Sequence, residues 1–473
     1  MEKYDLIVIG GGSGINVASN AAYKGLKVCL IERSQLGGTC TNNGCVPSKV
    51  LIYPADVVRI LQDAKAVGIK GANIEIDFPM IMGRMRSAVD KERTEIEESI
   101  KSSENATWYH DNAEFIGDYI LRVKDTAVTA PKIVIATGSR PMIPPIQGLK
   151  EAGYLDNISV LNLSKQPRSL IILGGGYIGC EYGHFFSAMG TEVTILGRNP
   201  RLLPNEDPEI SDMVKKVMSK NLLVLTNHDV NKVEVKNGMK VVTAKDRATG
   251  KETQYEAEEI LEALGRMSNS DTLKPEKTGV EIDKKGWIKV NEYLETSKLG
   301  IWALGDAIGK HMFKHTANYE ADIVWHNITS TEKEKADFHA VPHAVFTHPQ
   351  VGAVGLTEAE AKAAGKNIMV GRAKYTDVVK GFAMAEDDSL VKAVVEGGTE
   401  KILGCSIVGS EAAILIQQIV FLMNCGNQDL EPFRRTQVIH PALSEILIKA
   451  FSEVVYQEST SDEKSGENQQ GQG

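Results

Sequence analysis

Two stretches of the chain repeat one pattern of apolar and polar positions. Residues 3–33 (KYDLIVIGGGSGINVASNAAYKGLKVCLIER) and 168–198 (RSLIILGGGYIGCEYGHFFSAMGTEVTILGR) each predict a buried strand, a glycine turn, a helix and a second apolar strand. This βαβ pattern is typical of dinucleotide binding, with the pyrophosphate at the helix N-terminus. A single glycine motif is weak evidence, but two in the same context predict two bound nucleotides.

The first unit has Gly10 and Gly12 at its turn and Glu32 at the end of its second strand. The glycines permit close approach of a pyrophosphate, and an acid about twenty residues further on accepts hydrogen bonds from the adenosine ribose. Ile15 stands where a third glycine is usual, which predicts a slightly wider placement of the helix on its strand. The alternative, a glycine turn in an unrelated α/β protein, is disfavoured by the position of Glu32.

The second unit completes the glycine fingerprint with Gly174, Gly176 and Gly179. Its second strand ends at Gly197, where an acid would hold a free 2′-hydroxyl, and Arg198 follows. An arginine pairs with a 2′-phosphate, which an acid would repel. We therefore favour NADP(H) over NAD(H), with an ordinary surface arginine as the alternative.

The rest of the chain alternates between helical and strand patterns. Residues 77–103 predict an exposed, charge-laced helix, and residues 131–148 predict a strand followed by a proline-rich domain crossover. Residues 341–455 form an α+β block of strands and then helices. A chain of 473 residues is too long to fold around a single hydrophobic core, so several domains are expected.

Composition narrows the range of partners. The net charge of −9 disfavours nucleic acid, because phosphate binding needs a basic face. No apolar run reaches the roughly 18 residues of a spanning helix, and MEKYDLIVIGGG fits a buried strand better than a signal peptide. We expect a cytoplasmic protein with neither a nucleic acid nor a membrane as partner.

Cys40 and Cys45 lie close together in GGTCTNNGCVPSK, residues 37–49, in a chain with only six cysteines. In a regular helix residues i and i+5 are about 7.5 Å apart along the axis, so a disulfide between them requires a distorted turn, which Gly44 permits. We interpret the pair as redox machinery beside the first nucleotide. A metal site would need further ligands, and none is expected; two unconnected core cysteines are the other alternative.

Thiol exchange needs a base, because a free thiol has a pKa of about 8.5. His440, in TQVIHPALSEILIKAF, is followed by a proline and, one helical turn later, by Glu445, which can orient its imidazole. His343 and His348, in VPHAVFTHPQ, are the alternatives.

With these motifs assembled, the chain closely resembles the class I flavoprotein pyridine nucleotide–disulfide oxidoreductases over nearly its whole length. The motifs that carry the resemblance are GGTCTNNGCVPSK, ATGSRP (136–141), GGGYIGCE (174–181), ALGR (263–266), GIWALGDA (300–307) and HPALSE (440–445).

The resemblance implies an α/β fold with two Rossmann-like dinucleotide-binding domains followed by an α+β dimerisation domain. The implied limits are residues 1–148 and 270–338 for the FAD-binding domain, 149–269 for the NAD(P)-binding domain and 339–456 for the interface domain. Residues 457–473 are polar and glycine-rich, so we expect a disordered tail.

The resemblance also assigns roles around a flavin that has the nicotinamide on its opposite face. Cys45 would be the thiol nearest the flavin, and Cys40 would exchange with substrate. Lys49 would lie by the flavin N5, Asp306 by the ribityl phosphate region, and Glu181 at the nicotinamide side. The other implied cofactor-binding positions are Gly14, Thr39, Ala113, Gly138 and Gly265.

In the family His440 and Glu445 would form an acid/base pair that reaches the disulfide of the other subunit, which implies an obligate homodimer. The chain is most similar to dihydrolipoamide dehydrogenases of archaeal or bacterial type, so dihydrolipoamide is the first expected substrate, with a 2-oxoacid dehydrogenase complex as a candidate partner. Two departures weaken this expectation: Val438 replaces a common second histidine, and Gly197 followed by Arg198 stands where these enzymes usually carry the NAD-binding acid.

An NADPH-dependent reductase of a small disulfide, of the glutathione, mycothione or bis-gamma-glutamylcystine type, is the alternative function. Mercuric reductase is disfavoured because the sequence shows no vicinal C-terminal cysteines and no N-terminal metal-binding domain. An NAD(P)H oxidase or a non-enzymatic flavin-binding protein would need neither the cysteine pair nor His440.

Overall fold

A computed structural model describes residues 1–71 and 74–457; the expected tail, apart from Gln457, lies outside the described residues. The chain divides into two compact units. The first comprises Met1–Pro204, Met218–Val341 and Phe346–His348, and the second comprises Asn205–Val217, Pro342–Val345 and the chain from Pro349 onward. Both expected nucleotide units fall in the first, and the domain limits at residues 148, 269 and 338 stay predictions.

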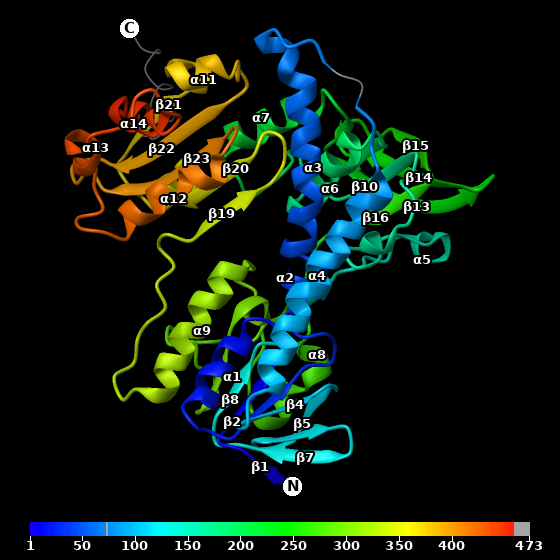
Figure 1. The fold of residues 1–473 in the computed structure, drawn as a ribbon, viewed down its shortest axis with the longest axis vertical. Coiled ribbons are helices and arrows are strands. Elements are labelled where there is room, and N and C mark those ends of the chain that lie inside the picture. The colour runs from blue at the N-terminus through cyan, green and yellow to red at the C-terminus, as the bar shows by residue number, and fades with distance from the viewer. Residues whose placement is uncertain (72–73, 458–473) are drawn as a thin grey trace, which may run out of the picture. The chain divides into compact units, whose positions relative to one another are not determined.

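The first βαβ unit forms the centre of a five-stranded parallel sheet with the order β18-β8-β2-β3-β4. Every residue of its central strand is buried, as expected for a parallel sheet covered on both faces. Helices α1 and α9 pack against each other beside it (Figure 1). The bounds are β2 (Leu6–Ile9), α1 (Gly14–Tyr23), β3 (Val28–Ile31), β4 (Ala106–Tyr109), β8 (Ile133–Ile135), β18 (Ile301–Ala303) and α9 (Lys314–Thr329).

A second, four-stranded sheet shares this core through Phe115, Leu121 and Val128. Its order is β1-β7-β6-β5, with β1 parallel to β7 and the other pairs antiparallel. The bounds are β1 (Glu2–Lys3), β5 (Ala113–Gly117), β6 (Ile120–Val123) and β7 (Thr126–Thr129).

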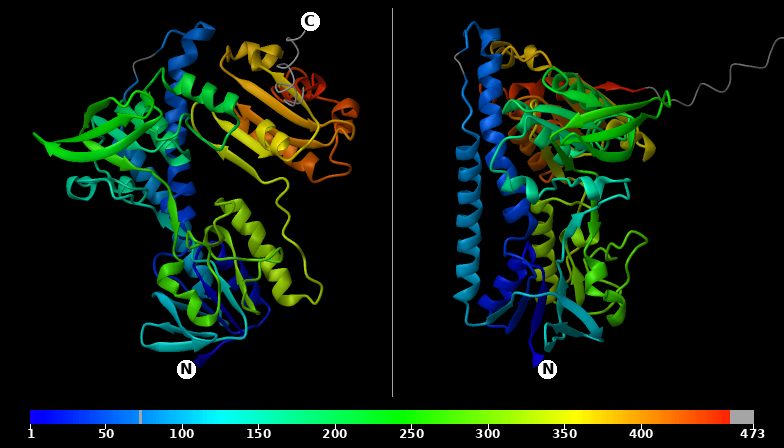
Figure 2. Two further views of the ribbon diagram at one scale, coloured as in Figure 1. Left: turned by 180° about the vertical axis from the view of Figure 1, so that it is seen from behind. Right: turned by 90° about the vertical axis from the view of Figure 1, so that its right-hand side faces the viewer.

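Three helices follow one another after β3: α2 (Gly38–Asn43), α3 (Cys45–Asp63) and α4 (Phe78–Lys101). The long helices α3 and α4 lie side by side (Figures 1 and 2). The helix predicted within residues 77–103 is confirmed, and Asp77 caps it by accepting a hydrogen bond from the Met80 amide at 2.9 Å. The expectation that it is exposed is wrong for one face, because its apolar side chains are buried against neighbouring elements.

The second βαβ unit is also confirmed, as β10 (Ser169–Leu173), α6 (Tyr177–Ala188) and β11 (Glu192–Leu196). The parallel sheet has the order β12-β11-β10-β16, and an antiparallel meander of β13, β14 and β15 packs on its core (Figure 2, green). The bounds are β12 (Leu223–Leu225), β13 (His228–Lys236), β14 (Met239–Asp246), β15 (Glu252–Ala257) and β16 (Glu259–Glu262).

A short antiparallel pair of strands follows the two parallel sheets in sequence: β9 comes after β8, and β17 comes after β16. The remaining elements of this unit are single-turn helices. The bounds are β9 (Ser139–Pro141), α5 (Leu149–Ala152), β17 (Arg266–Ser268) and α8 (Ser270–Leu273).

The second unit is a six-stranded antiparallel sheet with helices, which confirms the α+β pattern. Its order is β19-β20-β23-β22-β21-β24. The strands are β19 (Pro342–Val345), β20 (Val351–Gly355), β21 (Ile368–Ala373), β22 (Leu390–Glu396), β23 (Ile402–Val408) and β24 (Val455–Tyr456). The helices are α7 (Pro208–Met218), α10 (Glu358–Ala363), α11 (Val379–Ala383), α12 (Ala412–Met423), α13 (Glu431–Arg435) and α14 (Glu445–Ser452). None of the helices in the described part of the chain is long and apolar enough to cross a membrane.

A buried lysine holds three carboxylates together inside the second unit. The Lys392 ammonium lies 2.9 Å from Asp207, 2.6 Å from Glu209 and 2.9 Å from Glu358. The side chains of Lys392 and Asp207 are only 4% and 1% exposed, so the Asp207 carboxylate would be a buried charge without its cationic partner if Lys392 were removed.

Replacing Lys392 by Met should therefore lower the free energy of unfolding by about 3–5 kcal/mol, because Asp207 loses its buried counter-charge. Urea unfolding of the full chain measures the effect. The matched control is Lys362→Met, which removes an exposed partner of Glu358 at 2.8 Å and should cost less than about 1 kcal/mol. Equal losses in the two variants would contradict the assignment.

Candidate functional site

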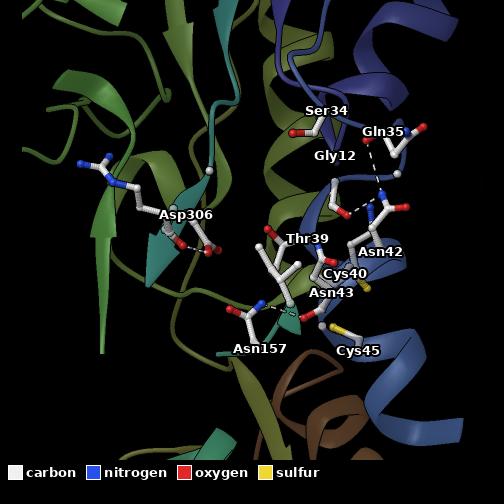
Figure 3. Close-up of a pocket in the computed structure, with 18 of the residues that line it drawn as sticks. Gly12, Ser34, Gln35, Thr39, Cys40, Asn42, Asn43, Cys45, Asn157 and Asp306 are labelled. Atoms are coloured by element: carbon white, nitrogen blue, oxygen red, sulfur yellow. Dashed lines mark hydrogen bonds between the residues drawn. The ribbon is translucent and has the colours of Figure 1, made fainter. Parts of the chain in front are cut away.

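The first glycine turn and the cysteine segment line one pocket. Its volume is about 520 Å³, and the lining comes from the turn after β2, from α2, from α4, and from the segments 136–141 and 304–317. Figure 3 shows Gly12, Thr39, Cys40, Cys45 and Asp306 around it. The predicted tie between the cysteine pair and the first nucleotide unit is thus a feature of the structure.

The glycine turn allows an unusually close contact of backbone segments. Gly10 has φ of +118°, and a Cβ there would lie 2.0 Å from the Ala136 carbonyl oxygen. The wider helix placement expected at Ile15 stays a prediction, and one residue earlier Gly14 lies close to the strand. A Cβ on Gly14 would lie 2.9 Å from Val8 Cγ1 and from Ala136 Cβ.

Glu32 lies at the edge of this pocket with its carboxylate fixed by backbone amides. Oε2 accepts from the Gly11 amide at 2.6 Å and Oε1 from the Ser34 amide at 2.7 Å. A smaller pocket of about 50 Å³ adjoins Glu32 and includes Gly10 and Ala113. The acid predicted to read a ribose thus borders both pockets.

Unpartnered polar atoms on the pocket wall fit a polar ligand. Asn42 Oδ1 and Thr137 Oγ1 are buried and have no hydrogen-bond partner among residues 1–71 and 74–457. Both residues line the larger pocket. Since buried polar atoms are normally satisfied, their arrangement supports a nucleotide or flavin at this place.

Asp306 is held by two residues that the sequence interpretation did not single out. Ser139 Oγ donates to Asp306 Oδ2 at 2.5 Å, and Arg266 Nε donates to Ser139 Oγ at 2.6 Å. The pairing of β9 with β17 brings them together. Both lie inside the quoted motifs ATGSRP and ALGR, which is the signal that could have found them. Gly138 also lines the larger pocket, whereas Gly265 lines neither pocket.

The cysteines lie on either side of a helix break. Cys40 belongs to α2 and Cys45 is the first residue of α3, with Gly44 between the helices at φ −139° and ψ −110°. The break confirms the predicted distorted turn. Asn157 donates to the Asn43 carbonyl at 2.9 Å and so supports the turn from outside (Figure 3).

Both cysteines are thiols in this structure. The interaction with the Cys40 side chain, helped by the positive charge of Lys49 and opposed by burial and Glu181, lowers the pKa of Cys45 to about 7. The interaction with Cys45, together with burial, raises the pKa of Cys40. The reduced pair therefore carries its thiolate on Cys45 and its proton on Cys40.

Lys49 lies one helical turn after Cys45 and forms an ion pair that joins α3 to α6. Its ammonium is 2.6 Å from Glu181 and 4.7 Å from the centre of the Phe346 ring. Glu181 also accepts a hydrogen bond from the Phe346 amide at 3.0 Å. Because Glu181 lies on the helix that follows the second glycine turn, this pair connects the cysteine segment to the second nucleotide unit.

The second glycine turn has the close contact that a dinucleotide fingerprint requires. A Cβ on Gly179 would lie 2.1 Å from the Gly174 carbonyl oxygen, and Gly176 precedes α6 directly. Arg198 follows β11 with its side chain 73% exposed, and its Nε lies 3.3 Å from Asp229.

The three candidate bases differ in which ring nitrogen is engaged. His440 Nδ1 lies 2.8 Å from Glu445 Oε1, and its Nε2 has no partner within the described part of the chain. Amide donation from Ala442, and then His440, lowers the pKa of Glu445. His343 and His348 instead hold Nε2 against Glu206 and Asp63. His440 belongs to the second unit and the cysteines to the first.

No group of three or more possible metal ligands occurs among the described residues.

Comparison with known proteins gives a consistent result. The family model for pyridine nucleotide-disulphide oxidoreductase matches residues 4–321, and the model for its dimerisation domain matches residues 341–451. Mycothione reductase of Mycobacterium tuberculosis is 34% identical over 95% of this chain and 99% of its own. Dihydrolipoyl dehydrogenase of Bacillus subtilis is 30% identical over 95% and 97%. The Cu(II) complex of the HOCl-induced flavoprotein disulfide reductase RclA from Escherichia coli superposes with a TM-score of 0.85 at 29% identity, covering 96% and 99%.

The charge distribution of the cysteine pair predicts a selective alkylation profile. In the reduced protein, iodoacetamide should modify Cys45 with a pH midpoint near 7, and Cys40→Ala should move this midpoint upward because the hydrogen-bond donor is lost. Lys49→Met should move it in the same direction. Peptide mass spectrometry measures each site, with exposed Cys425 as the internal standard. An unchanged midpoint in Cys40→Ala would contradict the assignment.

Proposed function

The chain belongs to the pyridine nucleotide–disulfide oxidoreductase family, and we propose that it reduces a low-molecular-weight disulfide with electrons from NADPH through Cys40 and Cys45. As a flavoprotein disulfide oxidoreductase it binds FAD and NAD(P)H, and its dimerisation domain supports a homodimer. The observation that carries the proposal is the pair of thiols on either side of the helix break at Gly44, both of which line the larger pocket.

The bound FAD supplies two-electron transfer between the nicotinamide and the Cys40–Cys45 disulfide. We assign the flavin to the larger pocket, with Glu32 at the adenosine ribose and Asp306 near the ribityl phosphate. The positive charge of Lys49 favours the Cys45 thiolate and would also stabilise the negative charge of a reduced flavin ring bound beside it.

Substrate exchange begins at Cys40, which keeps its proton in the reduced pair and therefore needs a base. We assign this role to the partner subunit's His440. Glu445 holds Nδ1, so Nε2 is the nitrogen available to take the proton. The Cys40 thiolate attacks one substrate sulfur, a mixed disulfide forms, and the first thiol leaves with the proton from the imidazole. Cys45 then attacks Cys40, which closes the disulfide, and the second thiol takes a proton from solvent.

Two observations support a small disulfide and NADPH over dihydrolipoamide and NAD. Arg198 and not an acid follows Gly197 at the end of β11, and the chain is 34% identical to a mycothione reductase over almost its whole length. Dihydrolipoamide is the second candidate substrate. The chain also matches dihydrolipoyl dehydrogenases over almost its whole length, at 30–32% identity. A 2-oxoacid dehydrogenase complex as partner belongs to that second candidate. A cytoplasmic location remains part of the proposal.

The test is steady-state turnover of the flavin-loaded protein with NADPH and NADH against glutathione disulfide, mycothione and lipoamide. We expect rapid NADPH-dependent reduction of a small disulfide, and Cys45→Ser should lower it by about 100-fold or more because electron transfer to the substrate is interrupted. Cys425→Ser is the matched control and should keep full turnover, since Cys425 is an exposed thiol outside the pocket lining.

Undiminished disulfide reduction by folded, flavin-loaded Cys45→Ser would exclude the proposed relay. Fast lipoamide turnover beside negligible reduction of the small disulfides would replace the first candidate substrate by the second and leave the relay intact.

The nucleotide preference has a separate test. Arg198→Glu should raise the Michaelis constant for NADPH by about tenfold or more, because a carboxylate repels the 2′-phosphate that an arginine attracts. The constant for NADH should change far less. Parallel changes for both nucleotides would show that Arg198 does not read the phosphate.

A further inference from the structure

Three loops distant in sequence meet at the carboxyl end of β11. The His228 amide donates to the Gly197 carbonyl at 2.9 Å, and the Asn227 amide donates to the Asn199 carbonyl at 2.8 Å. The Arg247 amide, in the turn between β14 and β15, donates to the Asn227 carbonyl at 2.9 Å. The meander turn is therefore fixed beside the loop that carries Arg198.

The turn that presents Arg247 is itself well ordered by hydrogen bonds. Asp246 accepts from the Ala248 amide at 2.8 Å, and the Gly250 amide donates to the Asp246 carbonyl at 2.8 Å. The hydrogen bond from the Ala248 amide lowers the pKa of the Asp246 carboxyl, which is ionised at neutral pH. Arg247 thus extends from a closed turn of defined direction.

One carboxylate holds the two arginines side by side. Asp229 Oδ1 lies 3.3 Å from Arg198 Nε, and Asp229 Oδ2 lies 3.2 Å from Arg247 Nε. Arg247 Nη1 also donates to the Arg198 carbonyl at 3.4 Å. A guanidinium bound to a carboxylate through Nε keeps terminal N–H donors for a second acceptor.

We propose that Arg247 is a second residue that reads the 2′-phosphate of NADP(H), together with Arg198. The proposal deepens the nucleotide side of the proposed function and rests on it. Gly197 puts no carboxylate at the strand end, and Asp229 is the carboxylate with which both guanidinium groups form an ion pair. A phosphate monoester carries −1.5 to −2 charges and can accept hydrogen bonds from both arginines, whereas a 2′-hydroxyl gains little from them.

Exposure agrees with a binding role. The side chains of Arg198, Arg247 and Asp229 are 73%, 42% and 41% exposed, so a ligand can reach all three. Exposed ion pairs of this kind contribute little to stability, and a purely structural pairing would leave nucleotide affinity unchanged.

The test measures binding of adenosine 2′,5′-bisphosphate and of AMP to the flavin-loaded protein by calorimetry, without turnover. Arg247→Ala should weaken the bisphosphate by about tenfold, the scale of one lost charge-assisted contact, and should affect AMP far less. The bisphosphate affinity of Arg247→Lys should lie between those of the unchanged protein and Arg247→Ala, because lysine keeps the positive charge but not the planar guanidinium. The matched control is Arg168→Ala, which removes an 86% exposed arginine paired with Glu258 before β10. It should behave as the unchanged protein.

Two outcomes would overturn the role of Arg247: a bisphosphate affinity equal to that of the Arg168→Ala control, or an equal loss for AMP, which indicates a structural effect. If the unchanged protein binds both probes equally, both the Arg247 role and the NADP(H) preference fail. In that case the protein would still reduce the disulfide with NADH, and Cys45→Ser would still abolish this activity. Failure of the nucleotide proposal is therefore distinguishable from failure of the cysteine relay.

Discussion

The helix break at Gly44, between Cys40 and Cys45, is the constraint on which the rest of the site depends. A continuous helix would put the two cysteines on different faces, whereas the break puts Cys40 in α2 and Cys45 at the start of α3, where both line one pocket. Their mutual interaction also makes the two thiols unequal, because it lowers the pKa of Cys45 and raises that of Cys40. Because of this difference, Cys45 carries the negative charge of the reduced pair, whereas Cys40 needs a base to lose its proton.

The surroundings keep that inequality in place. Asn157 supports the turn from outside, and Lys49 adds positive charge one helical turn after Cys45. The Lys49–Glu181 ion pair ties the cysteine helix to the helix of the second glycine turn. The cysteine helix and the second nucleotide unit are thus joined through α3 and α6.

Local patterns predicted most of the fold and the centre of the site. Both βαβ units, the helix at residues 77–103 and the distorted turn at Gly44 follow from periodicity and glycine chemistry, and the structure contains each of them. One local inference was wrong: one face of α4 is buried, because packing against neighbouring elements decides how exposed a helix is.

The sequence by itself determined which segments become strands, helices and glycine turns, because these depend on residues near one another in the chain. Only the tertiary structure decided which distant side chains meet. The Ser139–Arg266 contact beside Asp306 arises from the pairing of β9 with β17, and the Arg198–Asp229–Arg247 cluster arises where a meander turn meets the end of β11. Such contacts leave no periodic signal in the chain, since they depend on how sheets and loops pack after the local elements have formed.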